Sequence, residues 1–89
     1  MLFVALGNAR AGTTQERVAR RLEWSYPEGM QVIGEYWLQT DTPTIMAVVK
    51  ADDIGPIMAA TSAWDDVLSW TVVPAVSAEE GMELARQMV

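Results

Sequence analysis

The residues of this chain best able to do chemistry lie in GEYWLQT, residues 34–40, where a carboxylate is followed by two aromatic side chains and an amide. Burial of Glu35 without a good partner would raise its pKa, which is the property that a general acid or base needs. The structural alternative is an ion pair with Lys50 or a hydrogen bond to Thr71. Trp37 is suited to anchoring a dimer or to forming the wall of a ligand site.

The composition excludes several classes of site. The chain has no Cys and no His, so disulfides, zinc–thiolate sites, thiol nucleophiles, histidine acid–base catalysis and haem ligation by His or Cys are absent. We expect no cofactor and no metal. The net charge of −6 argues against binding to nucleic acid or to an anionic membrane surface. The first residues do not resemble a signal peptide and no apolar run reaches membrane-spanning length, which predicts a cytoplasmic protein.

A second candidate site follows the first predicted strand, in GNARAG. Asn8, Arg10 and the amides at a helix start near Thr13 could hold a phosphate or carboxylate. The stretch matches neither the Walker pattern nor the dinucleotide fingerprint. The alternative is that Thr13 and Glu16 form a capping box, in which their side chains satisfy free amides at the helix start.

The pattern of apolar residues and turn signals predicts one domain, residues 1–89, with the order βαββαβα. This order predicts a ferredoxin-like α+β sandwich: a four-stranded antiparallel sheet of strand order 4-1-3-2 with an extra C-terminal helix. Pro74 lacks an amide hydrogen and is therefore expected on an edge strand. We expect strands at 1–8, 30–39, 43–51 and 68–76, and helices at 13–26, 54–64 and 77–88.

A turn at Asp41 and Thr42 would set which residues share a face of the sheet, because directly opposed residues point the same way. It places Glu35 opposite Val48 and Trp37 opposite Met46. The predicted open face therefore carries Phe3, Ala5, Gln31, Ile33, Glu35, Trp37, Gln39, Met46, Val48, Lys50, Ser69, Thr71 and Val73. The opposite face, with Val32, Gly34, Tyr36 and Leu38, should pack beneath the helices. Val18, Ala19 and Leu22 should face the sheet from the first helix, with Arg17, Arg20 and Arg21 in solvent.

The predicted open face is too apolar to remain in water and too polar to be packed dry. Face-to-face homodimerisation around a partly polar cavity satisfies both constraints. We therefore expect a homodimer that binds a small, partly apolar ligand, with no enzymatic activity. The ligand-binding residues would be Gln31, Glu35, Trp37, Gln39, Met46 and Thr71. One alternative is a cofactor-independent isomerase or monooxygenase with Glu35 as the base and Asn8 or Gln39 polarising a carbonyl. Another is a purely structural dimer.

Three stretches, GNARAGTTQERVARRLEW, GEYWLQT and MAATSAWDDVLSWTVVPAV, resemble a small prokaryotic family described as a domain of unknown function and grouped with the dimeric α+β-barrel superfamily. The likeness spans essentially the whole chain. It implies a ferredoxin-like protomer whose sheet packs on a twofold mate. It does not imply one activity, because that superfamily contains monooxygenases, isomerases, haem enzymes, stress-induced barrels and ligand-sensing domains. No catalytic residue is carried over, since this chain lacks the His that catalytic members often use.

Overall fold

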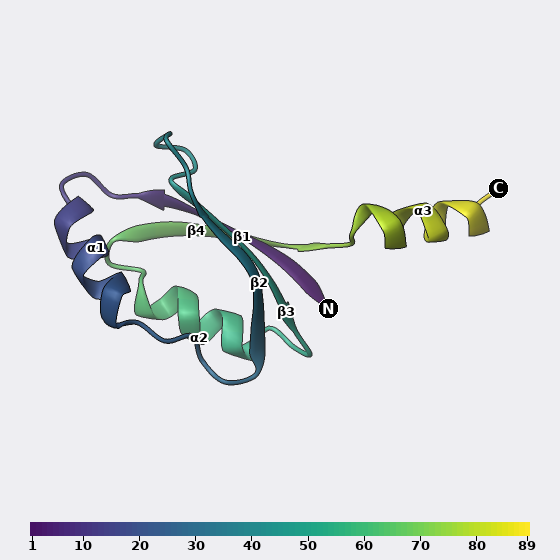
Figure 1. The fold of residues 1–89 in the computed structure, drawn as a ribbon, viewed down its shortest axis with the longest axis horizontal. Coiled ribbons are helices and arrows are strands. Elements are labelled where there is room, and N and C mark those ends of the chain that lie inside the picture. The colour runs from purple at the N-terminus through teal and green to yellow at the C-terminus, as the bar shows by residue number, and fades with distance from the viewer.

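The secondary structure follows the predicted order βαββαβα. The computed structural model describes all residues, 1–89 (Figure 1). Its elements are β1 (Leu2–Ala9), α1 (Thr14–Glu23), β2 (Met30–Trp37), β3 (Ile45–Ala51), α2 (Gly55–Ala63), β4 (Leu68–Ala75) and α3 (Ala78–Gln87). None of the three helices has the length and apolarity needed to cross a lipid bilayer.

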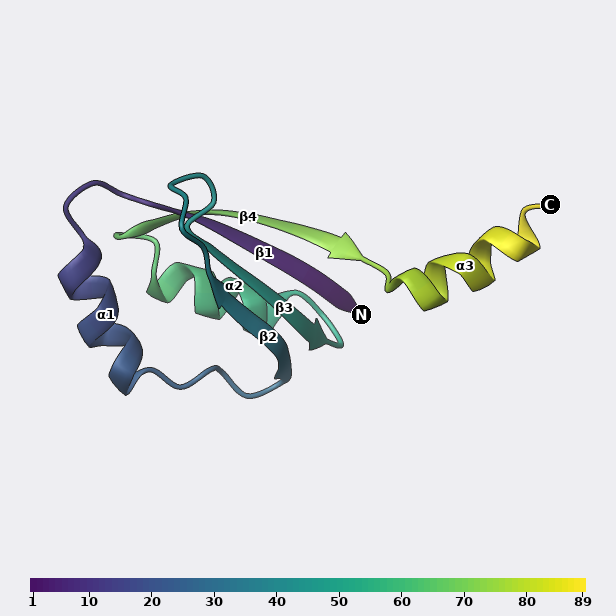
Figure 2. The same cartoon turned by 45° about the horizontal axis from the view of Figure 1, so that its top comes forward.

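The four strands form one antiparallel sheet in the order β2-β3-β1-β4, which confirms the predicted ferredoxin-like topology. The apolar strand β1 lies in the interior of the sheet, and Pro74 lies on the edge strand β4, as its missing amide requires. Helices α1 and α2 lie on the same side of the sheet (Figures 1 and 2). We call this side the inner face and the opposite side, which no helix covers, the outer face.

The core lies between the inner face and α2. One cluster of buried side chains joins strands β1 and β3 to Ile57 of α2, and consists of Phe3, Ala5, Ala47, Val49, Ala51 and Ile57. A second cluster lies between the end of α2 and the start of β4, and consists of Trp64, Val67 and Leu68. Trp70 packs against both clusters. Phe3 and Ala5 are therefore inner-face residues, so their predicted position on the open face was wrong.

Gly7 leaves the space that Trp70 occupies. It pairs with Ile45 on one side and Trp70 on the other. A Cβ atom at this position would lie 2.7 Å from the Ile45 Cγ2 atom and 3.0 Å from the Trp70 ring. The glycine in the middle of β1 therefore permits a large indole to lie across the sheet.

The register of β2 differs from the prediction because the connection between β2 and β3 is longer than a tight turn and because β2 is bulged. Leu38 and Thr44 form the last backbone pair, with an amide-to-carbonyl distance of 2.8 Å, so the loop covers residues 39–43. The bulge lies between Val32 and Gly34 and leaves Ile33 as an extra residue. Beyond it, Glu35 pairs with Ala47 and Trp37 with Ile45.

The half of β2 that follows the bulge consequently faces the opposite way from what simple alternation gives. Gln31 and Ile33 lie on the outer face, as predicted. Glu35 and Trp37 lie on the inner face, whereas the prediction placed them on the open face. Gly34 lies under the Tyr36 ring, whose hydroxyl would be 2.5 Å from an added Cβ, instead of allowing a helix to approach. The aromatic ring thus covers the glycine at the bulge.

The starts of the three helices differ in their hydrogen bonds. Ser77 caps α3, since its hydroxyl accepts from the Glu80 amide at 3.1 Å. Asp53 accepts from the Gly55 amide at 2.8 Å, just before α2. The capping box at Thr13 is absent: the Thr13 hydroxyl donates to the Arg10 carbonyl at 2.7 Å and makes no cap hydrogen bond to α1.

Helices α1 and α3 are the least embedded elements. Neither contains a buried residue. Leu22 is 80% exposed, which contradicts the prediction that it faces the sheet, and the arginines of α1 turn toward the protein instead. Helix α3 projects from the end of β4, away from the rest of the molecule (Figure 2). The Trp24 ring, which follows α1, meets the Trp64 ring at 5.7 Å between centroids.

Candidate functional site

A cavity of about 380 Å³ lies between α1, α2 and the inner face of the sheet. Most of the residues around it are apolar, and all four tryptophans of the chain are among them: Trp24, Trp37, Trp64 and Trp70. We call it the aromatic cavity. Its size lies within the range of small-molecule sites in proteins. Side chains from α1, from α2 and from all four strands line it.

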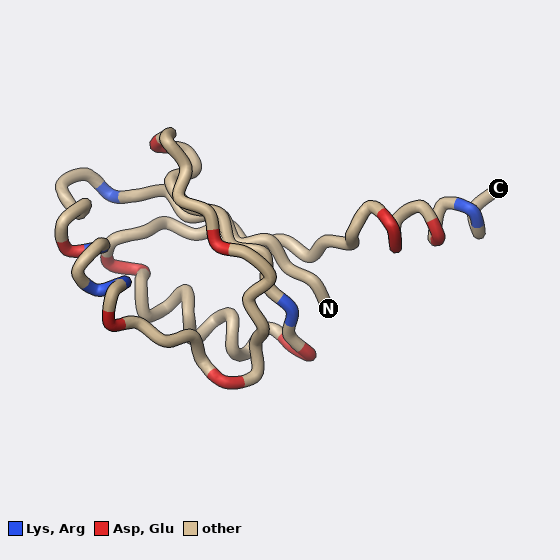
Figure 3. Tube along the Cα trace, viewed as in Figure 1, with Lys and Arg blue, Asp and Glu red and all other residues tan.

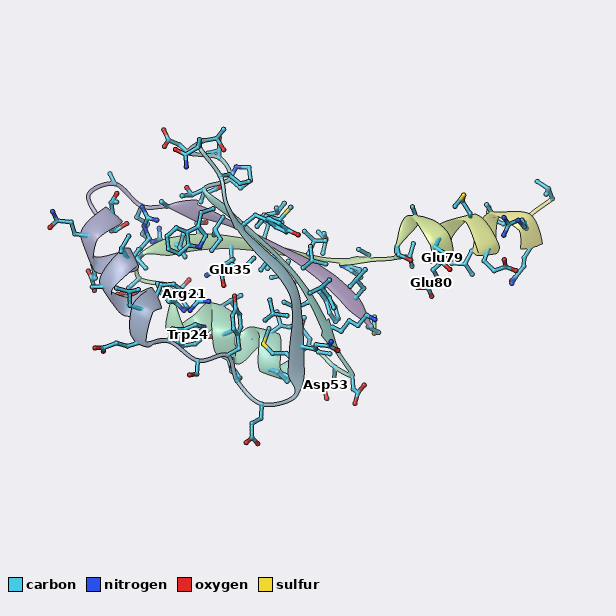
Figure 4. All side chains as sticks on the ribbon, viewed as in Figure 1. Arg21, Trp24, Glu35, Asp53, Glu79 and Glu80 are labelled. Atoms are coloured by element: carbon cyan, nitrogen blue, oxygen red, sulfur yellow. The ribbon has the colours of Figure 1, made fainter.

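Glu35 forms the polar centre of the cavity wall, and its carboxylate is bound by residues from three parts of the chain. The Arg21 guanidinium approaches it with both Nε and Nη2, at 2.9 Å to Oε2 and 3.0 Å to Oε1. The Tyr26 hydroxyl donates to Oε1, and the Trp37 indole N–H donates to Oε2 at 2.8 Å. Figure 4 shows Arg21 and Glu35 pointing toward one another between α1 and the sheet.

The environment of Glu35 favours its charged form. Burial, which leaves its side chain only 12% exposed, is the largest single influence and acts to raise the pKa. The hydrogen bonds from Arg21, Tyr26 and Trp37 together outweigh burial, so the pKa of Glu35 lies below its usual value. The carboxylate is therefore ionised at neutral pH and its oxygens already accept hydrogen bonds.

The two ionisable partners of Glu35, Tyr26 and Arg21, are held in their usual protonation states. Burial, followed by the hydrogen bond to Glu35, raises the pKa of Tyr26. The hydrogen bonds to Glu35 raise the pKa of Arg21. At neutral pH this cluster is a fixed ion pair with a neutral phenol, which suits it to orienting a bound molecule more than to moving protons.

A second ionic cluster fastens the middle of α1 to the end of α2. Arg20 bonds Asp66 at 2.8 Å and Glu16 at 2.6 Å, and its guanidinium lies 5.2 Å from the centre of the Trp64 ring. Most of the basic residues of the chain lie on or beside α1 (Figure 3). Arg20 and Arg21, predicted to lie in solvent, thus attach α1 to the body of the protein, whereas the Arg17 side chain bonds only Thr13 and Thr14.

The structure divides the predicted ligand-binding residues between the two faces of the sheet. Glu35, Trp37 and Gln39 line the aromatic cavity. Gln31, Met46 and Thr71 lie on the outer face, where Met46 pairs with Tyr36 and Thr71 with Leu6. The six residues therefore do not form one site. The ion pair that sequence reasoning proposed for Glu35 exists, but its partner is Arg21 instead of Lys50.

The residues predicted to bind an anion do not converge. Asn8 is in β1 opposite Ser69, while the Arg10 guanidinium donates to the Asp65 backbone carbonyl at 3.0 Å. The Thr13 hydroxyl is occupied by the Arg10 carbonyl and by Arg17. No group of three or more acidic residues is placed to hold a metal ion.

The outer face carries apolar side chains without a helix over them, interrupted by Gln31, Lys50 and Thr71. Leu2, Val4 and Leu6 of β1 run beside Met46 and Val48 of β3. Ile33, Tyr36 and Val73 extend this surface toward the two edges of the sheet and are about half exposed. Patches of this kind are uncommon on isolated monomers and mark interaction surfaces.

Sequence reasoning missed Arg17, Arg21, Tyr26, Trp64 and Trp70 as cavity residues. A signal for Arg21 was present in retrospect. Trp24 lies on the same side of the first helix as the arginines, and a tryptophan there is hard to reconcile with a solvated face. The aromatic surplus was another signal, since four tryptophans exceed what one small core absorbs.

Comparison with known proteins identifies the chain at family level. No curated protein matches it, and no solved structure does. The model of a family described as a domain of unknown function, DUF3303, matches residues 1–89. Because this match covers the chain from its first residue to its last, the protein belongs to the DUF3303 family.

Proposed function

We propose that this protein binds a small, partly apolar molecule in the aromatic cavity. The observation that carries the proposal is the position of the four tryptophans, all of which line one cavity of about 380 Å³ in a chain of 89 residues. Indole rings offer large, rigid contact surfaces at little cost in conformational entropy. Three of these rings, Trp24, Trp64 and Trp70, also pack together at the second core cluster, and Trp37 lines the cavity from β2.

The Glu35 cluster supports binding over catalysis. A general base must be free to accept a proton, but both oxygens of Glu35 accept hydrogen bonds and its pKa is lowered. The isomerase or monooxygenase alternative therefore has no favourable base among the predicted residues. In a binding protein the same cluster fixes the position of Trp37 at the wall of the cavity.

Adjacent aromatic residues on opposite faces of β2 provide the test. Trp37 is 57% exposed and lines the cavity, whereas Tyr36 is 52% exposed and faces outward. N-phenyl-1-naphthylamine, a neutral probe that fluoresces in apolar sites, is titrated against the wild type and against both alanine variants. We expect saturable binding by the wild type, about tenfold weaker binding by Trp37→Ala, and wild-type affinity for Tyr36→Ala.

Two results would contradict the proposal. One is the absence of saturable probe binding to the wild type. The other is an equal loss of affinity in both variants, which would indicate adsorption to apolar surface in general. Circular dichroism and thermal unfolding of each variant show whether the fold is kept.

We also propose that the protein is a homodimer through the outer face. The exposed apolar side chains of that face favour this assembly, because a second copy would remove them from water. Neither Glu35 nor Trp37 takes part, since both lie on the inner face. The dimer interface and the ligand site are therefore on opposite sides of the sheet in this proposal.

A further inference from the structure

The polar groups of the aromatic cavity differ in whether their hydrogen-bonding capacity is already used. The carboxylate of Glu35 accepts from Arg21, Tyr26 and Trp37. The hydroxyl groups of Thr40, Thr44 and Thr61 donate to backbone carbonyls. Among the cationic side chains of the wall, Arg21 is neutralised by Glu35, which leaves Arg17 as the guanidinium without a carboxylate partner.

Arg17 is fixed in position although it is not neutralised. Its Nε donates to the Thr13 hydroxyl at 3.0 Å and its Nη2 donates to the Thr14 hydroxyl at 3.2 Å. The Thr13 hydroxyl in turn donates to the Arg10 carbonyl, so it presents a lone pair to Arg17. The remaining N–H groups of this planar fork are free, and a fork of this shape matches the two oxygens of a carboxylate.

From this arrangement we infer that the ligand is a flat aromatic acid, with its carboxylate on Arg17 and its ring system among the tryptophans. This inference rests on the proposed binding function and adds to it the chemical class of the ligand. Arg17 and Thr14 line the cavity from α1, whereas Trp37, Trp64 and Trp70 line it from the sheet and from α2. A ligand that reaches both sides would bridge α1 to the body of the protein.

Asp41 is the other charged group of the wall without an ionic partner, and its charge opposes an anionic ligand. It is exposed on the loop between β2 and β3, so water screens it more than it screens the partly covered Arg17. The net preference of the cavity should therefore be set by Arg17. Replacement of Asp41 by Asn should strengthen the binding of an acid.

The test compares 2-naphthoate with its neutral amide, 2-naphthamide, as competitors of N-phenyl-1-naphthylamine. We expect the wild type to bind naphthoate at least about tenfold more tightly than naphthamide, because a charge-assisted bidentate contact discriminates by that amount. Arg17→Gln should abolish this preference, because it should weaken the binding of naphthoate more than the binding of naphthamide. Arg17→Lys keeps the charge but loses the planar guanidinium. This variant should retain part of the preference for naphthoate over naphthamide.

Arg10→Gln is the matched control. It removes the same charge from a residue that lies outside the cavity and bonds only a backbone carbonyl. If naphthoate and naphthamide bind the wild type equally, or if Arg17→Gln and Arg10→Gln behave alike, the inference is overturned while the proposed function stands. If neither the neutral probe nor the two competitors bind, the proposed function fails as well.

Discussion

Glu35 receives hydrogen bonds from Arg21 on α1, from Tyr26 in the loop that follows α1, and from Trp37 at the end of β2. One carboxylate thus connects a helix, a loop and the sheet around the same cavity. Because its side chain is almost covered, loss of its charge would leave the Arg21 guanidinium without its partner. Through this ion pair, Glu35 attaches α1 to the inner face of the sheet.

Glu35→Gln should lower the free energy of unfolding at neutral pH by about 1–3 kcal/mol, since a charged acceptor of several hydrogen bonds is lost. The pKa of Glu35 is depressed in the folded state. Its contribution to the free energy of unfolding is therefore complete above the pKa of an unfolded Glu, about 4.3, and is lost as the pH falls through the folded-state pKa. Urea unfolding from pH 7 to pH 3 checks both effects.

The pH dependence separates this role from a general effect of removing an acidic residue. The wild type should lose stability more steeply than Glu35→Gln below about pH 4.3. Glu23→Gln serves as the control, because Glu23 is exposed on α1 and has no ionic partner. Parallel stability curves for the wild type and Glu35→Gln would contradict the assignment.

At the scale of the elements, the order of strands and helices followed from apolar runs, caps and turn residues, and the antiparallel topology followed from that order. The face of the sheet on which Glu35 lies could not be predicted in this way. Its prediction depended on the length of the loop after β2 and on regular alternation along β2, and both assumptions were wrong. At the bulge the Tyr36 ring covers Gly34, a contact within one strand that the pattern of apolar and polar residues does not indicate.

The orientation of α1 also could not be derived from its sequence pattern. An amphipathic helix normally turns its apolar stripe to the core, but here Arg20 and Arg21 find Asp66 and Glu35, which are remote in the sequence. The ionic partners and the Trp24–Trp64 contact decide the rotation of the helix. Such partners are visible only once the fold brings distant residues together.

The packing of β1 against β4 makes a direct prediction for Gly7. Gly7→Ala should destabilise the protein by about 1–3 kcal/mol, because the new methyl group would overlap Ile45 and the Trp70 ring in the interior of the sheet. Gly81→Ala is the matched control, since its Cβ would meet only Val76 at an ordinary 3.6 Å and alanine favours a helix. Thermal unfolding should show a loss for Gly7→Ala and none for Gly81→Ala.

At the scale of the whole molecule, the sheet separates two surfaces of different character. The inner face holds the aromatic cavity beneath α1 and α2, and the outer face holds exposed aliphatic side chains. Helix α3, with exposed Met82 and Leu84, adds further apolar surface away from both (Figure 2). The proposed assembly and the proposed ligand binding can therefore be tested with separate substitutions.

Ile33→Glu should convert the proposed dimer into a monomer, because Ile33 is 50% exposed on the outer face and a charge there would be buried without a partner in the interface. Sedimentation velocity at micromolar concentration measures the change. Leu22→Glu adds the same charge to an exposed residue of α1, on the other side of the sheet, and should leave the sedimentation coefficient unchanged. A monomeric wild type would contradict the proposed assembly.

The bulge in β2 has a consequence for how members of this family can differ in length. Ile33 is the unpaired extra residue between Val32, opposite Val49, and Gly34, opposite Val48. A one-codon deletion at position 33 would make the ladder regular and leave every other side chain of the strand on its present side. A deletion at Tyr36 that regularised the strand would instead send Glu35 out of the cavity. Gaps at these two positions in an alignment would therefore have opposite meanings for the site.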